Sequence, residues 1–129
     1  MKKLSYLLTA VLCAIILMSA VKDEILTKTN GVYIVNTTKI ASDVKGYKGP
    51  TPLKIYIKNN KIQKIEALQN NETPRYFKMV TSQLLNKWNG MPVKKVANAK
   101  IDGVTGATFS SKAVKENVKR GVDYYLKHK

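Results

Sequence analysis

The sequence predicts an α+β fold, a small antiparallel sheet with two helices, preceded by an apolar N-terminal segment. Three features carry this prediction: aliphatic residues at alternate positions over residues 53–58, apolar residues at helical spacing over residues 77–88, and an uncharged stretch over residues 4–21. Alternation is typical of a half-buried strand, whereas spacings of three and four residues place side chains on one face of a helix. Strands followed by helices indicate the α+β class.

The N-terminal segment, residues 1–21, belongs to a different physical class from the rest of the chain. Lys2 and Lys3 precede an uncharged stretch of roughly 18 residues, close to the length that spans a bilayer. A basic start and the small pair Ser19-Ala20 also resemble a secretory signal. The segment is therefore expected to be either an uncleaved transmembrane anchor or a cleaved signal.

The charges that flank this segment predict the side of the membrane on which the domain lies. Lys2 and Lys3 precede it, whereas Lys22 is offset by Asp23 and Glu24. The excess of positive charge keeps the N-terminus in the cytoplasm and sends residues 22–129 across. We expect a protein of the cell membrane with its domain on the extracytoplasmic side, or a secreted protein if the segment is cleaved.

The first half of the domain is predicted to form the sheet. Residues 22–30 are polar and are expected to be a linker, and the domain itself is expected over residues 31–129. The β-branched and aromatic run 32–35 predicts a strand, and residues 42–51 are rich in turn formers. After the alternating strand, Asn59-Asn60 can adopt positive φ, so residues 61–68 should return as a hairpin partner.

The spacing of the apolar residues in that returning strand is irregular. Ile62 and Ile65 break strict alternation, which predicts a β-bulge.

The second half is predicted to hold the helices. Thr73-Pro74 is a helix start, with Thr as the N-cap and Pro at the first helical position, and this helix is expected to end near Gly90. Residues 92–104 are expected to be irregular or weakly extended, with one short strand. A second helix is expected from Ser110 or Ser111 to about Leu126.

The composition limits the chemistry that the domain can perform unaided. Cys13 lies in the apolar segment and His128 lies at the C-terminus, and the chain contains no other cysteine or histidine. The domain therefore offers no usual nucleophile–base pair and no metal-ligand cluster, so we predict no catalytic residues and no metal site. Any redox chemistry would come from a cofactor.

The net charge predicts anionic partners. The formal charge is +15, and it falls only to +13 when Lys2 and Lys3 are removed. Such a surface favours nucleic acid, acidic lipid or a phosphate-bearing ligand. Because the domain is predicted to be exported, nucleic acid is not expected, and the membrane surface or an acidic redox partner fits better.

The chemically informative segment is Asp102 to Ser111, a run of small and hydroxyl residues that leads into a helix. The first turn of a helix has unpaired N–H groups and attracts phosphate. Gly106 and Ala107 leave space at the backbone, and hydroxyls come from Thr105, Thr108, Ser110 and Ser111. By itself this pattern predicts an anion site, and the alternative is an ordinary turn followed by a serine N-cap.

Residues 102–108, Asp-Gly-Val-Thr-Gly-Ala-Thr, closely resemble the flavinylation motif of the FMN-binding domain family. This family includes the flavin-carrying subunits of sodium-pumping NADH:quinone oxidoreductase and of Rnf electron-transfer complexes. The resemblance implies that Thr108 takes FMN through a phosphoester made by a flavin transferase, which uses FAD and releases AMP. It also implies that Asp102, Thr105, Gly106 and Ala107 form the recognition motif and cradle, with Ser110 and Ser111 beside them.

Two further segments carry the same resemblance. Residues 46–50, Gly-Tyr-Lys-Gly-Pro, look like the family's glycine-rich loop, and Glu72, Thr73 and Pro74 look like its Glu-Thr-Pro-Gly turn near the flavin. Arg75 stands where the family usually has glycine, and the alternative for this turn is a simple helix cap.

The resemblance therefore implies a membrane-associated flavoprotein with covalent FMN that carries electrons to or from a membrane redox partner. It does not imply an enzyme with its own substrate. The alternative from another class is a basic binding module for acidic lipid or nucleic acid, without flavin.

Overall fold

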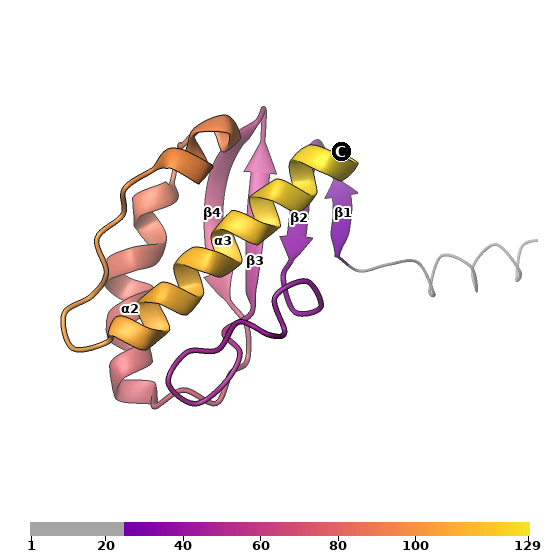
Figure 1. The fold of residues 1–129 in the computed structure, drawn as a ribbon. Coiled ribbons are helices and arrows are strands. Elements are labelled where there is room, and N and C mark those ends of the chain that lie inside the picture. The colour runs from indigo at the N-terminus through magenta and orange to yellow at the C-terminus, as the bar shows by residue number, and fades with distance from the viewer. Residues whose placement is uncertain (1–24) are drawn as a thin grey trace, which may run out of the picture.

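The computed structural model describes residues 25–129, and these form an α+β domain with a four-stranded antiparallel sheet. The predicted anchor or signal over residues 1–21 lies outside the described residues. The strands follow one another across the sheet in chain order (Figure 1). The elements are β1 (Leu26–Thr29), β2 (Val32–Asn36), β3 (Leu53–Lys58), β4 (Lys61–Ala67), α2 (Pro74–Leu84), the 3-10 helices η1 (Leu85–Trp88) and η2 (Val93–Asn98), and α3 (Thr108–His128).

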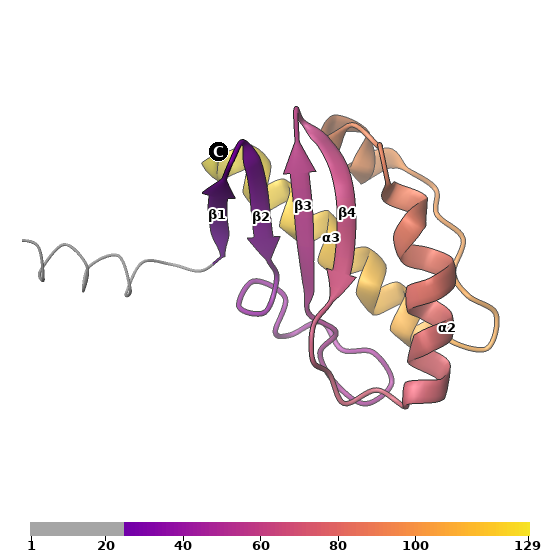
Figure 2. The same cartoon turned by 180° about the vertical axis from the view of Figure 1, so that it is seen from behind.

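The helix α3 crosses one face of the sheet, and α2 lies beside the β4 edge, as the two opposite views show (Figures 1 and 2). Seen from behind, the other face of the sheet has no helix of residues 25–129 over it (Figure 2). The aliphatic side chains of β3 that alternate in the sequence are completely buried beneath α3, whereas Lys54 and Tyr56 are only half-buried. The core therefore lies between one face of the sheet and the helices.

The predicted hairpin and bulge are both confirmed. Asn59 and Asn60 have φ of 53° and 58°, and Lys58 pairs with Lys61 directly across the turn. The register then places Ile62 opposite Ile57 and Lys64 opposite Tyr56, so Gln63 is the extra residue. The bulge returns Ile65 to the inner face, where the core requires it.

The sheet begins earlier than predicted. Residues 26–29, which lie within the predicted linker, form the edge strand β1 and pair with β2 through a turn at Asn30-Gly31. Both turn residues have positive φ, at 51° and 79°. Asn-Gly favours this conformation in two-residue hairpins. The turn therefore adds a polar segment to the sheet as an edge strand, which has one exposed side.

Two expectations for the second half require correction. The short strand expected within residues 92–104 is absent from the described residues, which instead form η2 there, with a single bridge from Pro92 to Lys61. The buried side chains of Val93 and Val96, three residues apart, match the 3-10 period and dock this turn against α3. The other correction is that α3 begins at Thr108, two residues before the earlier of the two predicted starts.

A buried polar cluster joins the long loop between β2 and β3 to the middle of α3. The Thr37 hydroxyl donates to Asn117 Oδ1 at 2.5 Å and accepts the Leu53 N–H at 2.9 Å. Asn117 Nδ2 donates to the Ala113 carbonyl at 2.9 Å and to the Thr51 hydroxyl at 3.4 Å. Because Thr37 and Thr51 stand at the two ends of the loop, α3 holds both ends in place.

Across residues 25–129, every helix is too short or too polar to cross a bilayer.

Candidate functional site

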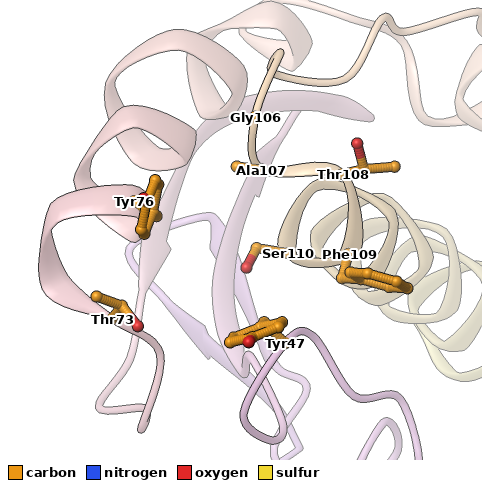
Figure 3. A pocket seen from close by; sticks show the side chains of 8 residues that line it. All are labelled: Tyr47, Thr73, Tyr76, Gly106, Ala107, Thr108, Phe109 and Ser110. Carbon is orange, nitrogen blue, oxygen red and sulfur yellow. The ribbon is translucent and has the colours of Figure 1, made fainter.

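A pocket of about 250 Å³ lies where three segments meet: the loop before β3, the first turn of α2 and the start of α3. Figure 3 shows its lining side chains from close by. The pocket is lined by Tyr47, Thr73, Tyr76, Gly106, Ala107, Thr108, Phe109 and Ser110.

Aromatic rings surround this pocket. Tyr47, Tyr76 and Phe109 are 71%, 50% and 64% exposed, and they are three of the four exposed large apolar side chains in residues 25–129. The rings of Tyr47 and Phe109 lie 6.4 Å apart, and Ser110 lies between the three rings (Figure 3). A cluster of exposed rings around one hollow is typical of a binding site for a flat apolar group.

The carboxylate of Glu72 holds the walls of the pocket together. Its Oε1 accepts the Tyr47 N–H and the Ser110 hydroxyl, each at 2.7 Å, and its Oε2 accepts the Lys48 N–H at 2.6 Å. Glu72 is 6% exposed and does not line the pocket. Its place in the structure is therefore that of a positioning residue that joins the loop to α3.

The backbone at Gly46 must come close to this carboxylate. A Cβ at Gly46 would lie 2.0 Å from Glu72 Oε1, closer than any side chain tolerates. Glycine at this position therefore lets the loop present consecutive N–H groups to one carboxylate.

The turn before α3 is built around Gly106. Its φ is +86°, and the Ala107 N–H donates to the Val104 carbonyl at 3.0 Å, which is the pattern of a type II turn. Other residues are strained at this φ. The turn delivers the chain directly into the helix, so Thr108 is the first helical residue, and it is exposed.

Ser110 and Ser111 do not cap the helix, because both lie within its first turn. The Ser110 hydroxyl donates to Glu72, and the Ser111 hydroxyl accepts the Val104 N–H at 3.0 Å. Ala107 is the N-cap residue and makes no side-chain cap bond. Consequently the unpaired N–H groups of the first turn are left for another acceptor.

A second hollow of about 380 Å³ adjoins the pocket at this helix start. It is basic, because Lys112 and Lys115 line it, and Lys112 follows Thr108 by one helical turn on the same face. Gly106 and Thr108 line both the pocket and the hollow. The hollow is lined by Gly103, Val104, Thr105, Gly106, Thr108, Ser111, Lys112 and Lys115.

Of the remaining site residues that the sequence predicted, some line the pocket and others lie outside it. Thr73 lines the pocket and makes no side-chain cap bond, whereas Pro74 takes the first position of α2 and does not line the pocket. Asp102 lies farther along, in a third hollow, with its carbonyl 3.4 Å from the Lys87 ammonium. The structure thus brings Thr73, Gly106, Ala107, Thr108 and Ser110 together at the pocket.

The family comparison identifies this arrangement. The model of the FMN-binding domain matches residues 46–123, from the glycine-rich loop to the last turns of α3. The chain belongs to the FMN-binding domain family. The match includes every segment that lines the pocket, so the domain has a flavin-binding role. A comparison with curated proteins found no match.

The residues present fit FMN, which combines a flat ring system with a phosphate. The aromatic pocket offers stacking surfaces for the ring. The basic hollow offers two ammonium groups beside the free N–H groups of a helix start, a favourable setting for a phosphate.

Several residues of this FMN-binding domain were not predicted as site residues. Tyr47, Tyr76 and Phe109 form the aromatic wall, and Lys112 and Lys115 form the basic one. Tyr76 carried a usable signal, because it is an aromatic residue that lies off the apolar face of its helix. The lysines carried none, because lysines are abundant throughout the domain.

Proposed function

We propose that this protein carries FMN covalently, through a phosphoester to the Thr108 hydroxyl, and acts as an electron-transfer flavoprotein outside the cytoplasm. The observation that supports the proposal is the place of Thr108. It lines both the aromatic pocket and the basic hollow, which are the two surroundings that the two halves of FMN require. Of the hydroxyl residues in residues 102–111, no other lines both.

The proposed attachment is a group transfer from FAD by a flavin transferase. The Thr108 oxygen forms a bond to the phosphorus on the flavin side of the pyrophosphate, the bond between that phosphorus and the bridging oxygen breaks, and AMP leaves. The hydroxyl proton is released with it. The exposure of Thr108 at the helix start supports this step, since an enzyme must reach the hydroxyl from outside.

The chain's own residues hold and orient the group. Tyr47, Tyr76 and Phe109 would contact the ring, and Lys112, Lys115 and the helix N–H groups would hold the phosphate. FMN, when bound, supplies reversible one- or two-electron chemistry. The ammonium groups of the adjoining hollow would also favour negative charge on the flavin, because opposite charges stabilise one another.

The location and the partners are part of the proposal. The charges flanking residues 4–21 support export of the domain, with that segment as a membrane anchor or a cleaved signal. The protein would then exchange electrons with a redox protein at the membrane, and would have no substrate of its own.

The decisive experiment measures intact mass after co-expression with a flavin transferase. The wild-type chain should gain the mass of one FMN less one water, and peptide mapping should place it on Thr108. Thr108→Ala should gain nothing and remain as stable as the wild type, because the residue is exposed. Thr105→Ala is the matched control: it alters a hydroxyl that lines only the hollow, so loading should fall without disappearing.

Three other outcomes would contradict the proposal in different ways. A yellow colour that leaves the protein on denaturation would indicate FMN held without a covalent bond. A colourless protein that binds acidic lipid or nucleic acid would indicate the basic binding module. Added mass on Thr108→Ala would show that the attachment site is elsewhere.

A further inference from the structure

A third hollow, of about 520 Å³, lies along α3 next to the attachment site. It has an apolar floor that includes Trp88, Val96 and Ile101, and a rim of four lysines. We call it the basic groove. Its lining residues are Trp88, Val96, Ala97, Ala99, Lys100, Ile101, Asp102, Lys112, Lys115, Glu116 and Lys119.

The basic groove continues directly from the hollow beside Thr108. Both depressions are lined by Lys112 and Lys115, and the hollow in turn shares Thr108 with the aromatic pocket. A molecule seated in the basic groove would therefore lie immediately beside whatever group Thr108 carries.

The lysines of the basic groove are without carboxylate partners among residues 25–129. Lys115 donates to the Ile101 carbonyl at 3.0 Å, and no ion pair within the described part of the chain includes Lys100, Lys112 or Lys119. Glu116 lies in the groove but pairs with Arg120 at 3.3 Å. Asp102 also lines the groove, so the four lysines face two carboxylates and leave a net positive charge. A positive potential at a hollow steers anionic partners toward it.

From these features we propose that the basic groove is the docking surface for an acidic protein that exchanges electrons with the flavin on Thr108, an inference that rests on the proposed function. Charge complementarity accelerates the encounter, and the apolar floor supplies area to bury. One electron passes between the partner's redox group and the flavin, and solvent supplies or takes the proton.

The shape of the surface favours a protein over a membrane. A concave groove can surround a projecting acidic element on several sides, whereas a bilayer presents a broad surface that contacts mainly the rim of a groove. The flatter candidate for headgroups is the open face of the sheet, where Lys64 already pairs with Glu66 at 3.0 Å and lies over the Tyr56 ring.

The test uses the full, flavin-loaded chain in neutral detergent, with reduced flavodoxin as the acidic redox probe. Stopped-flow measurement of flavodoxin oxidation should give a rate that falls steeply with salt. Lys100→Glu with Lys119→Glu should lower this rate about tenfold at low ionic strength. The control is Lys39→Glu with Lys58→Glu, which changes the charge equally at exposed lysines outside the groove and should lower the rate less than about twofold.

A second measurement does not depend on the flavin. In the unloaded full chain, adding oxidised flavodoxin should shift the backbone amide signals of Ile101, Lys112 and Lys119 in an NMR titration. Intact mass of every variant reports loading separately, so loss of the flavin is distinguished from loss of docking.

Three results would overturn the inference. The first is equal slowing by both double variants, which would show that only net charge matters. The second is a rate independent of salt and of both double variants. The third is groove amides that shift with phosphatidylglycerol in the micelles and not with flavodoxin, which would assign the groove to the membrane.

Discussion

The two ends of α3 are held in place by different forces. Toward its C-terminus, Val114, Val118, Val122 and Tyr125 are buried against the sheet and η2. In its first turn, Thr108 and Phe109 are exposed, and the turn is held by the hydroxyls of Ser110 and Ser111. Apolar burial therefore holds one end, together with a hydrogen bond from the Tyr125 hydroxyl to Asn60 Oδ1 at 2.6 Å. Directed hydrogen bonds to Glu72 and to the preceding turn hold the other.

Because of this difference, the C-terminal part of α3 contributes mainly to stability, whereas its first turn contributes mainly to the binding site. Burial is not directional and contributes in proportion to area, so the C-terminal part supplies the framework. Hydrogen bonds fix orientation, so the first turn can remain exposed to a ligand and still be positioned accurately. Substitutions at the two ends should consequently fail in different ways.

The largest effect is expected at Gly121, in the buried part. A Cβ there would lie 2.5 Å from Ile55 Cδ1 and 3.0 Å from Thr37 Cγ2. Gly121→Val should therefore lower the free energy of unfolding by about 3 kcal/mol through overpacking. Urea denaturation measures this, with Lys119→Val as the exposed control on the same helix. The molecules that remain folded should still take up flavin, and selective loss of loading would contradict the comparison.

Glu72 tests the hydrogen-bonded end. Glu72→Gln removes the charge that accepts from Tyr47, Lys48 and Ser110. It should cost about 2 kcal/mol of stability, because hydrogen bonds to charged groups are the strong ones. Loading should fall further than the stability loss explains, since the loop carrying Tyr47 is released. Unchanged loading in the folded protein would show that the loop is held by other contacts, and Glu66→Gln serves as an exposed control.

Ser111 should have a smaller effect. Ser111→Ala leaves the Val104 N–H without its partner, which should cost about 1 kcal/mol. Thermal unfolding and the extent of loading measure the two consequences. Ser82→Ala is the matched control, because its hydroxyl bonds only to its own helix and is exposed. If Ser111→Ala and Ser82→Ala lowered stability and loading equally, the hydrogen bond between two segments would be no more important than the one within a helix.

The smallest effect is expected at Asp43. The Arg120 guanidinium, which holds both oxygens at 2.5 and 3.0 Å, keeps the pKa of the Asp43 carboxyl below its usual value of 3.8. A lowered folded-state pKa contributes stability above pH 3.8 that disappears as the pH falls through the folded value. Asp43→Asn should thus be slightly less stable than the wild type near neutral pH, and the difference should shrink as the pH falls below 3.8. Urea midpoints across this range measure the difference, and one that persists in acid would indicate a cause other than the ion pair.

The parts of the fold that were predicted correctly are those specified by neighbouring residues. The β3–β4 hairpin follows from alternation and from Asn59-Asn60, and its bulge follows from the spacing of Ile62 and Ile65. The start of α2 follows from Thr73-Pro74. Each signal lies within a few residues of the structure that it determines. The strand β1 was missed although Asn30-Gly31 offered a signal of the same local kind.

The site was predicted in part, for a different reason. The residues of the turn before α3 form a contiguous motif, so a resemblance could locate Thr108 and its neighbours. For Ser110 and Ser111 the sequence predicts a place beside the flavin cradle, and the alternative is a helix cap, because a serine before an apolar run is usually one. Their actual partners, Glu72 and the Val104 N–H, lie 38 and 7 residues away in the sequence.

By itself the sequence determined the class of fold, the hairpin, the helix starting at Thr73-Pro74 and the segment that contains Thr108. These depend on side-chain periodicity and turn chemistry, which act over a few residues. Only the tertiary structure decided that Tyr47, Tyr76 and Phe109 surround one pocket and that Glu72 holds it together. Only the tertiary structure also explains Gly121, whose missing side chain lets α3 approach β3 closely. No local sequence pattern specifies this approach. Contacts between distant segments depend on the packing of the whole core, and patterns that extend over only a few residues do not specify that packing.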